Sequence, residues 1–212
     1  MIASSTDGAT TFISPLPIAT KTELSGGNCR GFVLPPTLFR AWPTMFPVVR
    51  THPTKPDVVY VVFGADPNPF PDDGFATNDD SDIFFSRSVN GGTTFISPIR
   101  VNNDTGINDQ FFAWMTVQPS GDIQVTFGDR REDPADTFYN VFRAVSTDGG
   151  LSFKPNDKVT AGPSNPNTEF LGFFIGDYFG NTSSSGQVFA AWTDTRFEQD
   201  QNIFVGTAPG RR

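Results

Sequence analysis

The sequence predicts an all-β fold in which many short strands are joined by tight turns. Glycine and proline are abundant, with 20 and 18 residues in a chain of 212, and there are 23 phenylalanines. Glycine and proline favour turns, whereas aromatic residues favour strands, so this composition fits short strands better than long helices. No apolar run approaches ~18 consecutive residues, so the sequence predicts no membrane span.

A turn segment occurs three times and sets the organisation of the chain. Residues 5–12, 88–95 and 146–153 align without gaps and share the pattern Ser-x-Asp/Asn-x-Gly/Ala-x-Thr/Ser-Phe. An Asp or Asn side chain can accept hydrogen bonds from the backbone amides that follow it, and glycine tolerates a positive φ at a bend. The pattern therefore predicts the same hairpin turn in each repeat.

The predicted strands follow one order around these turns. In the first repeat they lie at 46–49, 58–63, 83–86 and 99–101, in the second at 112–117, 123–127, 139–145 and 158–159, and in the third at 176–178, 188–192 and 203–205. A further strand near 16–18 follows the first turn segment. The predicted units are therefore the end of one repeat at 1–20, repeats at 44–101 and 107–160, and the start of another at 174–208.

The turn segments resemble the Asp-boxes, or BNR repeats, of the sialidase superfamily, although Ala9 replaces the usual Gly and Asn90 the usual Asp. Residues 108–112, 129–134, 175–178 and 192–196 also resemble bacterial sialidase-like BNR proteins. The resemblance implies a sialidase-type β-propeller of four-stranded blades with Asp-box turns, of which about three blade-equivalents are present. Propellers need roughly four to eight blades to close. We therefore expect a fragment of a longer chain or, alternatively, closure with a second copy.

The candidate site lies at the ends of strands that share one face. Because neighbouring strands alternate in direction, the start of each first strand and the end of each second strand meet away from the box turns. Asp66, Asp129 and Asp194 occupy equivalent positions, and arginines follow the last two at a distance of two residues. The catalytic candidates are Asp129, Asp177 and Tyr178, and the substrate-binding candidates are Arg131, Asp109, Asp194 and Arg196.

The recurrence of Asp-x-Arg in successive blades favours a second interpretation. A catalytic residue should occur in one blade, whereas a structural ion pair between blades can recur. The family resemblance implies three arginines around a substrate carboxylate, a tyrosine nucleophile assisted by glutamate, and an aspartate acid. The Arg-Ile-Pro motif of the first arginine is absent, and residues 39–43 are only a loose counterpart. Glu169 and Glu198 are the candidate partners of Tyr178.

Charge and composition restrict the partners. The formal net charge of −8 and the pI of about 4.5 disfavour binding to nucleic acid. An acidic loop at 72–82 could hold Ca²⁺ through oxygen ligands, but it lacks EF-hand spacing and also fits a solvated loop. The single histidine, His52, and the single cysteine, Cys29, argue against a zinc site and a disulfide framework.

Two functional hypotheses follow. In the first, the chain is part of a secreted sialidase-like propeller that hydrolyses or binds glycans or glycoconjugates at the funnel face, as an exo-α-sialidase-like glycoside hydrolase would. The sequence predicts no signal peptide within this chain. In the second, the propeller is a non-catalytic scaffold, binding or assembly module, whose partners include the remaining blades or a second copy of the chain.

Overall fold

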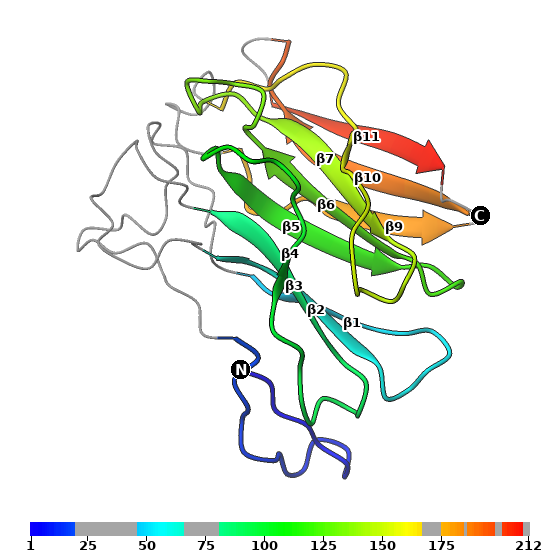
Figure 1. Ribbon diagram of the computed structural model, residues 1–212. Coiled ribbons are helices and arrows are strands. Elements are labelled where there is room, and N and C mark those ends of the chain that lie inside the picture. The colour runs from blue at the N-terminus through cyan, green and yellow to red at the C-terminus, as the bar shows by residue number, and fades with distance from the viewer. Residues whose placement is uncertain (20–45, 66–80, 167–174, 185, 198–200, 210–212) are drawn as a thin grey trace, which may run out of the picture.

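The computed structural model describes residues 1–19, 46–65, 81–166, 175–184, 186–197 and 201–209 (Figure 1). These residues form eleven strands and contain no helix. The strands are β1 (Val48–Thr51), β2 (Val59–Ala65), β3 (Asp82–Ser88), β4 (Ile99–Arg100), β5 (Gln110–Val117), β6 (Ile123–Asp129), β7 (Asn140–Ser146), β8 (Asp157–Lys158), β9 (Gly180–Ser184), β10 (Gln187–Asp194) and β11 (Asn202–Pro209). The described residues contain no helix that could cross a membrane.

The strands form three antiparallel sheets, each built from consecutive strands. The sheets have the orders β1-β2-β3-β4, β5-β6-β7-β8 and β9-β10-β11, and we call them blade 1, blade 2 and blade 3. Their innermost strands β1, β5 and β9 are neighbours, so the blades stand side by side (Figure 1). The chain thus has the partial β-propeller fold that the sequence predicts. Two strand positions differ. β9 begins at Gly180, and residues 176–178 belong to the loop that leads into it. Residues 16–18 form no strand, and Leu16 makes only an isolated bridge with Ile2.

The hydrophobic core lies between the blades. Phe85 of blade 1 and Met115 and Phe127 of blade 2 are fully buried in one cluster. Phe111 of blade 2 and Trp192 of blade 3 belong to a second cluster. Every residue of β6 and β7 is buried, because blade 2 has a neighbouring blade on each side. In β6 the apolar residues Ile123, Val125 and Phe127 still alternate with Gln124 and Thr126, which are buried as well.

The three turn segments fold as the sequence predicts. In the third, Asp148 Oδ1 accepts from the backbone N–H groups of Leu151 and Ser152 at 3.0 and 3.1 Å, and from Ser146 Oγ at 2.7 Å. Asn90 closes the second turn in the same way, with the backbone N–H of Thr94 as donor at 2.9 Å. We call these segments the box turns. The end of the blades that carries them is the box face, and the opposite end, where β1, β5 and β9 begin, is the funnel face.

The box turn of blade 2 should make stability depend on pH. Slight burial raises the pKa of Asp148, but hydrogen bonds from Ser152 and Ser146 outweigh this and lower the pKa from 3.8 to about 2. An aspartate with a lowered pKa stabilises the fold above its unfolded pKa, and this contribution is lost as the pH falls towards 2. Urea unfolding at pH 6 and pH 3 should therefore show a smaller loss of stability for Asp148→Asn than for the wild type. Equal losses in both proteins would contradict this prediction.

Candidate functional site

All seven predicted site residues lie towards the funnel face. Asp129 and Asp194 are the last residues of β6 and β10. Asp109 directly precedes β5, whose first residue, Gln110, is paired with Asp129. Asp177 and Tyr178 lie in the loop before β9. The topology therefore brings these residues to one end of the blades, and their contacts divide them into three groups.

Asp129 and Arg131 form a closed ion pair within one turn. The backbone N–H and Nε of Arg131 donate to the two oxygens of Asp129, each at 2.8 Å, and Nη2 lies 2.6 Å from Oδ2. The guanidinium lies over the ring of Phe142, 4.4 Å from its centre. Burial raises the pKa of Asp129 above its ordinary value, and the bonds from Arg131 offset part of this rise. Asp129 is 1% exposed, so its carboxylate faces Arg131 and not the solvent.

Blade 3 repeats this arrangement. The backbone N–H and Nε of Arg196 donate to Asp194 Oδ1 at 3.0 and 2.8 Å, and Nη2 forms a further contact with Oδ2. The guanidinium lies over Phe204, 4.9 Å from its centre. Burial raises the pKa of Asp194, but bonds from Arg196 and Trp192 Nε1 outweigh it, so the net pKa is lowered. The repeated geometry is that of a structural ion pair, although each pair lies within a turn rather than between blades.

Arg131 additionally connects separate segments of the chain. Its Nη1 donates to Asn103 Oδ1 at 2.8 Å, and its Nη2 donates to Asn156 Oδ1 at 3.0 Å. Asn103 lies in the segment between blades 1 and 2, whereas Asn156 directly precedes β8. Nε, Nη1 and Nη2 of Arg131 thus each have an acceptor within the protein, and these bonds join the turn to two other segments.

Arg130 is a central residue of this face that the sequence reasoning missed. It is 0% exposed, and its Nη1 lies 3.3 Å from Asp109 Oδ2 and 3.5 Å from Asp136 Oδ2. The signal is the alternation of side chains along β6. Because Asp129 and Arg131 point to one side, the residue between them points to the other, towards Asp109. Asp109 is itself 1% exposed, so this pair is part of the protein interior.

Tyr178 differs from the other candidates because it is open to solvent. Its side chain is 56% exposed and meets Phe46, itself 39% exposed, in an edge-to-face contact with ring centres 4.9 Å apart. Beside these rings, Asp177 and Trp114 line a depression of only about 10 Å³, the space of a single water molecule. The aromatic pair is therefore an open surface and not an enclosed catalytic pocket.

Several predictions concern residues outside the described part of the chain. These are Asp66, Glu169, Glu198, Cys29, the segment 39–43 and most of the acidic loop at 72–82. Of that loop, Asp82 is described; it is buried and lies 2.8 Å from Arg100 Nη2. Burial raises the pKa of Asp82, and the hydrogen bond from Asn102 opposes the rise. Among the described residues, no three His, Cys, Asp or Glu side chains are grouped so that they could hold a metal ion.

Comparisons with known proteins support the fold. No protein-family model and no curated protein matches the sequence. Among solved structures, an α-L-arabinanase of Penicillium chrysogenum complexed with arabinobiose matches with a TM-score of 0.56 at 14% identity, over 85% of this chain and 48% of that one. A Hadza microbial sialidase matches with a TM-score of 0.55 at 15% identity, over 96% and 37% of the two chains. A GH93 α-L-arabinofuranosidase of Fusarium graminearum matches with a TM-score of 0.54 at 13% identity, over 82% and 48%.

The chain thus spans less than half the length of each of these three structures. At such low identity the likeness concerns the arrangement of strands and not the residues of a site. The described strands, their sheet order and these comparisons agree that the chain has the fold of part of a β-propeller.

Proposed function

We propose that this chain is part of a secreted glycan-binding propeller, which holds carbohydrate at its funnel face around Tyr178. The observation that carries the proposal is the exposed pair of Tyr178 and Phe46 where the inner strands begin. Large aromatic side chains are usually buried, and exposed ones gathered in one place mark binding surfaces. The likeness to carbohydrate-active propellers supports the choice of ligand class.

The surroundings of this pair suit a sugar. An aromatic ring offers an apolar face to the C–H groups of a sugar, and the carboxylate of Asp177 can accept hydrogen bonds from its hydroxyls. Along the neighbouring inner strands, the guanidinium of Arg50 lies over the ring of Trp114, 5.6 Å from its centre. This combination of apolar and polar groups on an open surface favours shallow contact with one side of a glycan.

Binding without hydrolysis fits the contacts better than catalysis does. A glycosidase places two carboxyl groups on either side of the scissile bond. Asp129 and Asp194 are buried and are occupied by Arg131 and Arg196. The sialidase-like alternative relies on Tyr178 as nucleophile with Glu169 or Glu198, which lie outside the described residues.

Replacing Tyr178 with alanine should weaken glycan binding about fivefold to thirtyfold. Truncating an aromatic anchor typically costs about 1–2 kcal/mol, and about 1.4 kcal/mol corresponds to a factor of ten. Calorimetry would be run with a panel that includes a sialoside and arabinobiose. Phe12→Ala serves as the control, because Phe12 is also exposed but lies on the box face. Absence of binding by the wild type, or equal binding by Tyr178→Ala, would refute the proposal. A fluorogenic sialoside added to the same proteins would reveal hydrolysis.

A second candidate function is assembly, because one face of blade 3 exposes apolar residues. Ile203 and Val205 of β11 are 74% and 63% exposed, whereas Trp192 and Phe204 pack towards blade 2. The corresponding apolar face of blade 1 is covered by blade 2, and that of blade 2 is covered by blade 3. We propose that a blade of a second copy covers this face when no other blade is present.

Light scattering should then give at least twice the 23.1 kDa mass of one chain. Ile203→Asp should lower the mass towards one chain by placing a charge in the contact. Val89→Asp is the control, because Val89 is 61% exposed on the box face. A wild-type protein with the mass of a single chain at micromolar concentrations would exclude this mode of assembly.

A further inference from the structure

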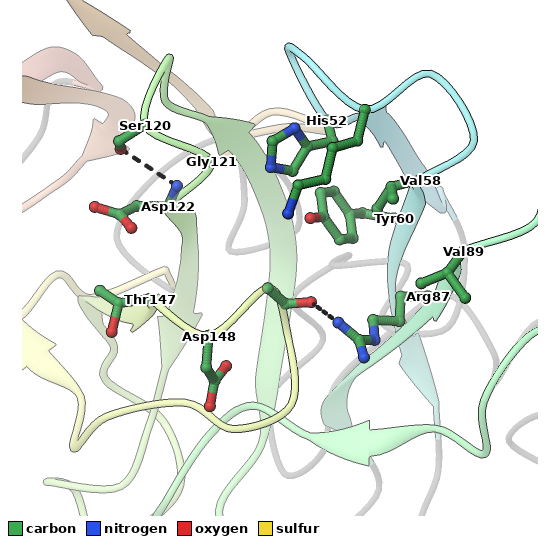
Figure 2. Close-up of a pocket in the computed structure, with 12 residues that line it drawn as sticks. His52, Val58, Tyr60, Arg87, Val89, Ser120, Gly121, Asp122, Thr147 and Asp148 are labelled. Carbon is green, nitrogen blue, oxygen red and sulfur yellow. Dashed lines mark hydrogen bonds between the residues drawn. The ribbon is translucent and has the colours of Figure 1, made fainter.

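A cavity of about 420 Å³ opens on the box face, at the opposite end of the blades from Tyr178 (Figure 2). Its walls come from two different blades. Blade 1 contributes the β1–β2 turn with His52 and Lys55, together with Tyr60 and Arg87. Blade 2 contributes the turn at 120–122 and the box turn at 147–149. The cavity is large enough for a small molecule and lies where no glycan site is predicted.

The wall from blade 1 is cationic, although the chain as a whole is acidic. Arg87 Nη1 donates to the backbone carbonyl of Gly149 at 2.7 Å, and its buried Nε has no hydrogen-bond partner among the described residues. No carboxylate of the described residues lies within ion-pair distance of this guanidinium. Lys55 lines the same wall and is exposed. Two positively charged side chains thus line the cavity.

Tyr60 adds a donor from the protein interior. Its side chain is 1% exposed, and its hydroxyl points into the cavity (Figure 2). This hydroxyl forms no hydrogen bond with another described residue, so it can still donate to a ligand in the cavity. Burial raises the pKa of Tyr60, and the charge of Arg87 opposes this only in part, so the hydroxyl stays protonated at neutral pH. A ligand oxygen would supply the acceptor that this hydroxyl lacks.

The sole histidine completes this wall. The backbone N–H of Thr54 donates to His52 Nδ1 at 3.2 Å and holds the ring in place. The ring lies against Gly121, where an added Cβ would come within 2.6 Å of Nε2. The absence of a side chain at Gly121 therefore lets the imidazole lie at the boundary between the two blades. Because the ring lines the cavity, its NMR signals should shift when a ligand binds there.

The opposite wall offers acceptors. The carboxylate oxygens of Asp148 accept hydrogen bonds within their own box turn, from the hydroxyls of Ser146 and Ser152. Asp122 lies on the same side of the cavity, across from Tyr60 and Arg87 (Figure 2). We propose that this inter-blade cavity binds a small ligand that carries an anionic group, a carboxylate or a phosphate. The anion is held by Arg87, Tyr60 and Lys55.

The single histidine allows a direct test by NMR. The ring protons of His52 give the only histidine signals of the chain, because the sequence contains one histidine. The protein would be titrated at constant pH and ionic strength with inorganic phosphate, glucuronate or glucose, each to about 10 mM, above the Kd of a millimolar site. We expect a saturable shift of the His52 signals with phosphate, with glucuronate or with both. Comparing these two titrations shows whether the cavity prefers a phosphate or a carboxylate. Glucose should cause no saturable shift.

Variants assign the shift to the cavity. Lys55→Gln should weaken anion binding about threefold to fivefold, as expected for an exposed charge, and Arg87→Gln should weaken it at least tenfold. Lys154→Gln removes a charge that does not line the cavity and should bind as the wild type does. Because Arg87 also bonds to Gly149, Lys55→Gln keeps the test valid if Arg87→Gln fails to fold.

No saturable shift with either anion, an equal shift with glucose, or unchanged binding by Lys55→Gln overturns the proposal. Tyr178→Ala should bind the anion normally, so this outcome is independent of glycan binding.

Discussion

Gly150→Ala is expected to destabilise the protein by about 2–5 kcal/mol. Gly150 has a φ of +83°, a conformation that costs an L-residue about 1–2 kcal/mol. A Cβ at this position would also lie 2.3 Å from Cε1 of Phe85, which is fully buried in the core of blade 1. Overpacking of this kind costs about 1–3 kcal/mol. Urea unfolding followed by tryptophan fluorescence measures the difference.

Gly149→Ala is the matched control. Its φ of +73° is similar, but its Cβ would meet the end of the Arg87 side chain at 3.2 Å and the Tyr60 hydroxyl at an ordinary contact distance of 3.9 Å. It should therefore show the backbone cost with little of the packing cost. Phe85→Leu should recover part of the stability lost in Gly150→Ala, because it removes the overlapping ring atoms. If Gly149→Ala and Gly150→Ala prove equally stable, the box turn of blade 2 does not pack on Phe85 as described.

Asp129→Ala is expected to cost about 3–5 kcal/mol of stability, the usual effect of breaking a buried ion pair. The substitution removes three acceptor contacts of Arg131 and leaves a largely buried guanidinium over Phe142. Arg131→Met should also destabilise the fold, but its side chain can keep the packing on Phe142. The double variant should lose less stability than the two single variants lose in sum, because removing both side chains leaves neither charge buried without its partner.

This cycle separates the two interpretations of Asp129. A structural pair predicts a coupling of at least about 1 kcal/mol between Asp129 and Arg131. A catalytic aspartate predicts that Asp129→Asn remains as stable as the wild type and loses turnover of a glycoside. Additive stability losses, together with a folded and inactive Asp129→Asn protein, would restore the catalytic role that the sequence resemblance implies.

The strands and the box turns could be predicted because local chemistry determines them. Asp148 and Asn90 each close a turn within a few residues, so sequence spacing alone identifies their partners. The face on which Asp129, Asp177 and Tyr178 lie could also be predicted, since it follows from the alternation of strand direction. What could not be predicted is which of these side chains are engaged in ion pairs within the protein and which are exposed to solvent. That depends on burial between blades, as the different surroundings of Asp129 and Tyr178 show.

Arg130 and the box-face cavity were missed for a related reason. Both depend on contacts between segments that are distant in sequence. Arg130 meets Asp109 across the start of β5, and Arg87 meets Gly149 across two blades. A single sequence contains no local signal for the second of these contacts. The alternation along β6 was the one signal that could have identified Arg130.

The packing of the box turns of blades 1 and 2 on the segment that precedes each blade makes unfolding directional. Gly150 of blade 2 lies against Phe85 of blade 1, and Gly92 of blade 1 lies near Ile2 of the N-terminal segment. Stability in such an array is approximately a sum of single-repeat terms and nearest-neighbour terms. Blade 2, enclosed on both sides, is then the most cooperative unit, whereas blade 3 exposes Ile203 and Val205 on one side. Fraying should start at the edge of blade 3 and stop at the blade 2 interface, so a partly unfolded chain keeps blades 1 and 2 joined.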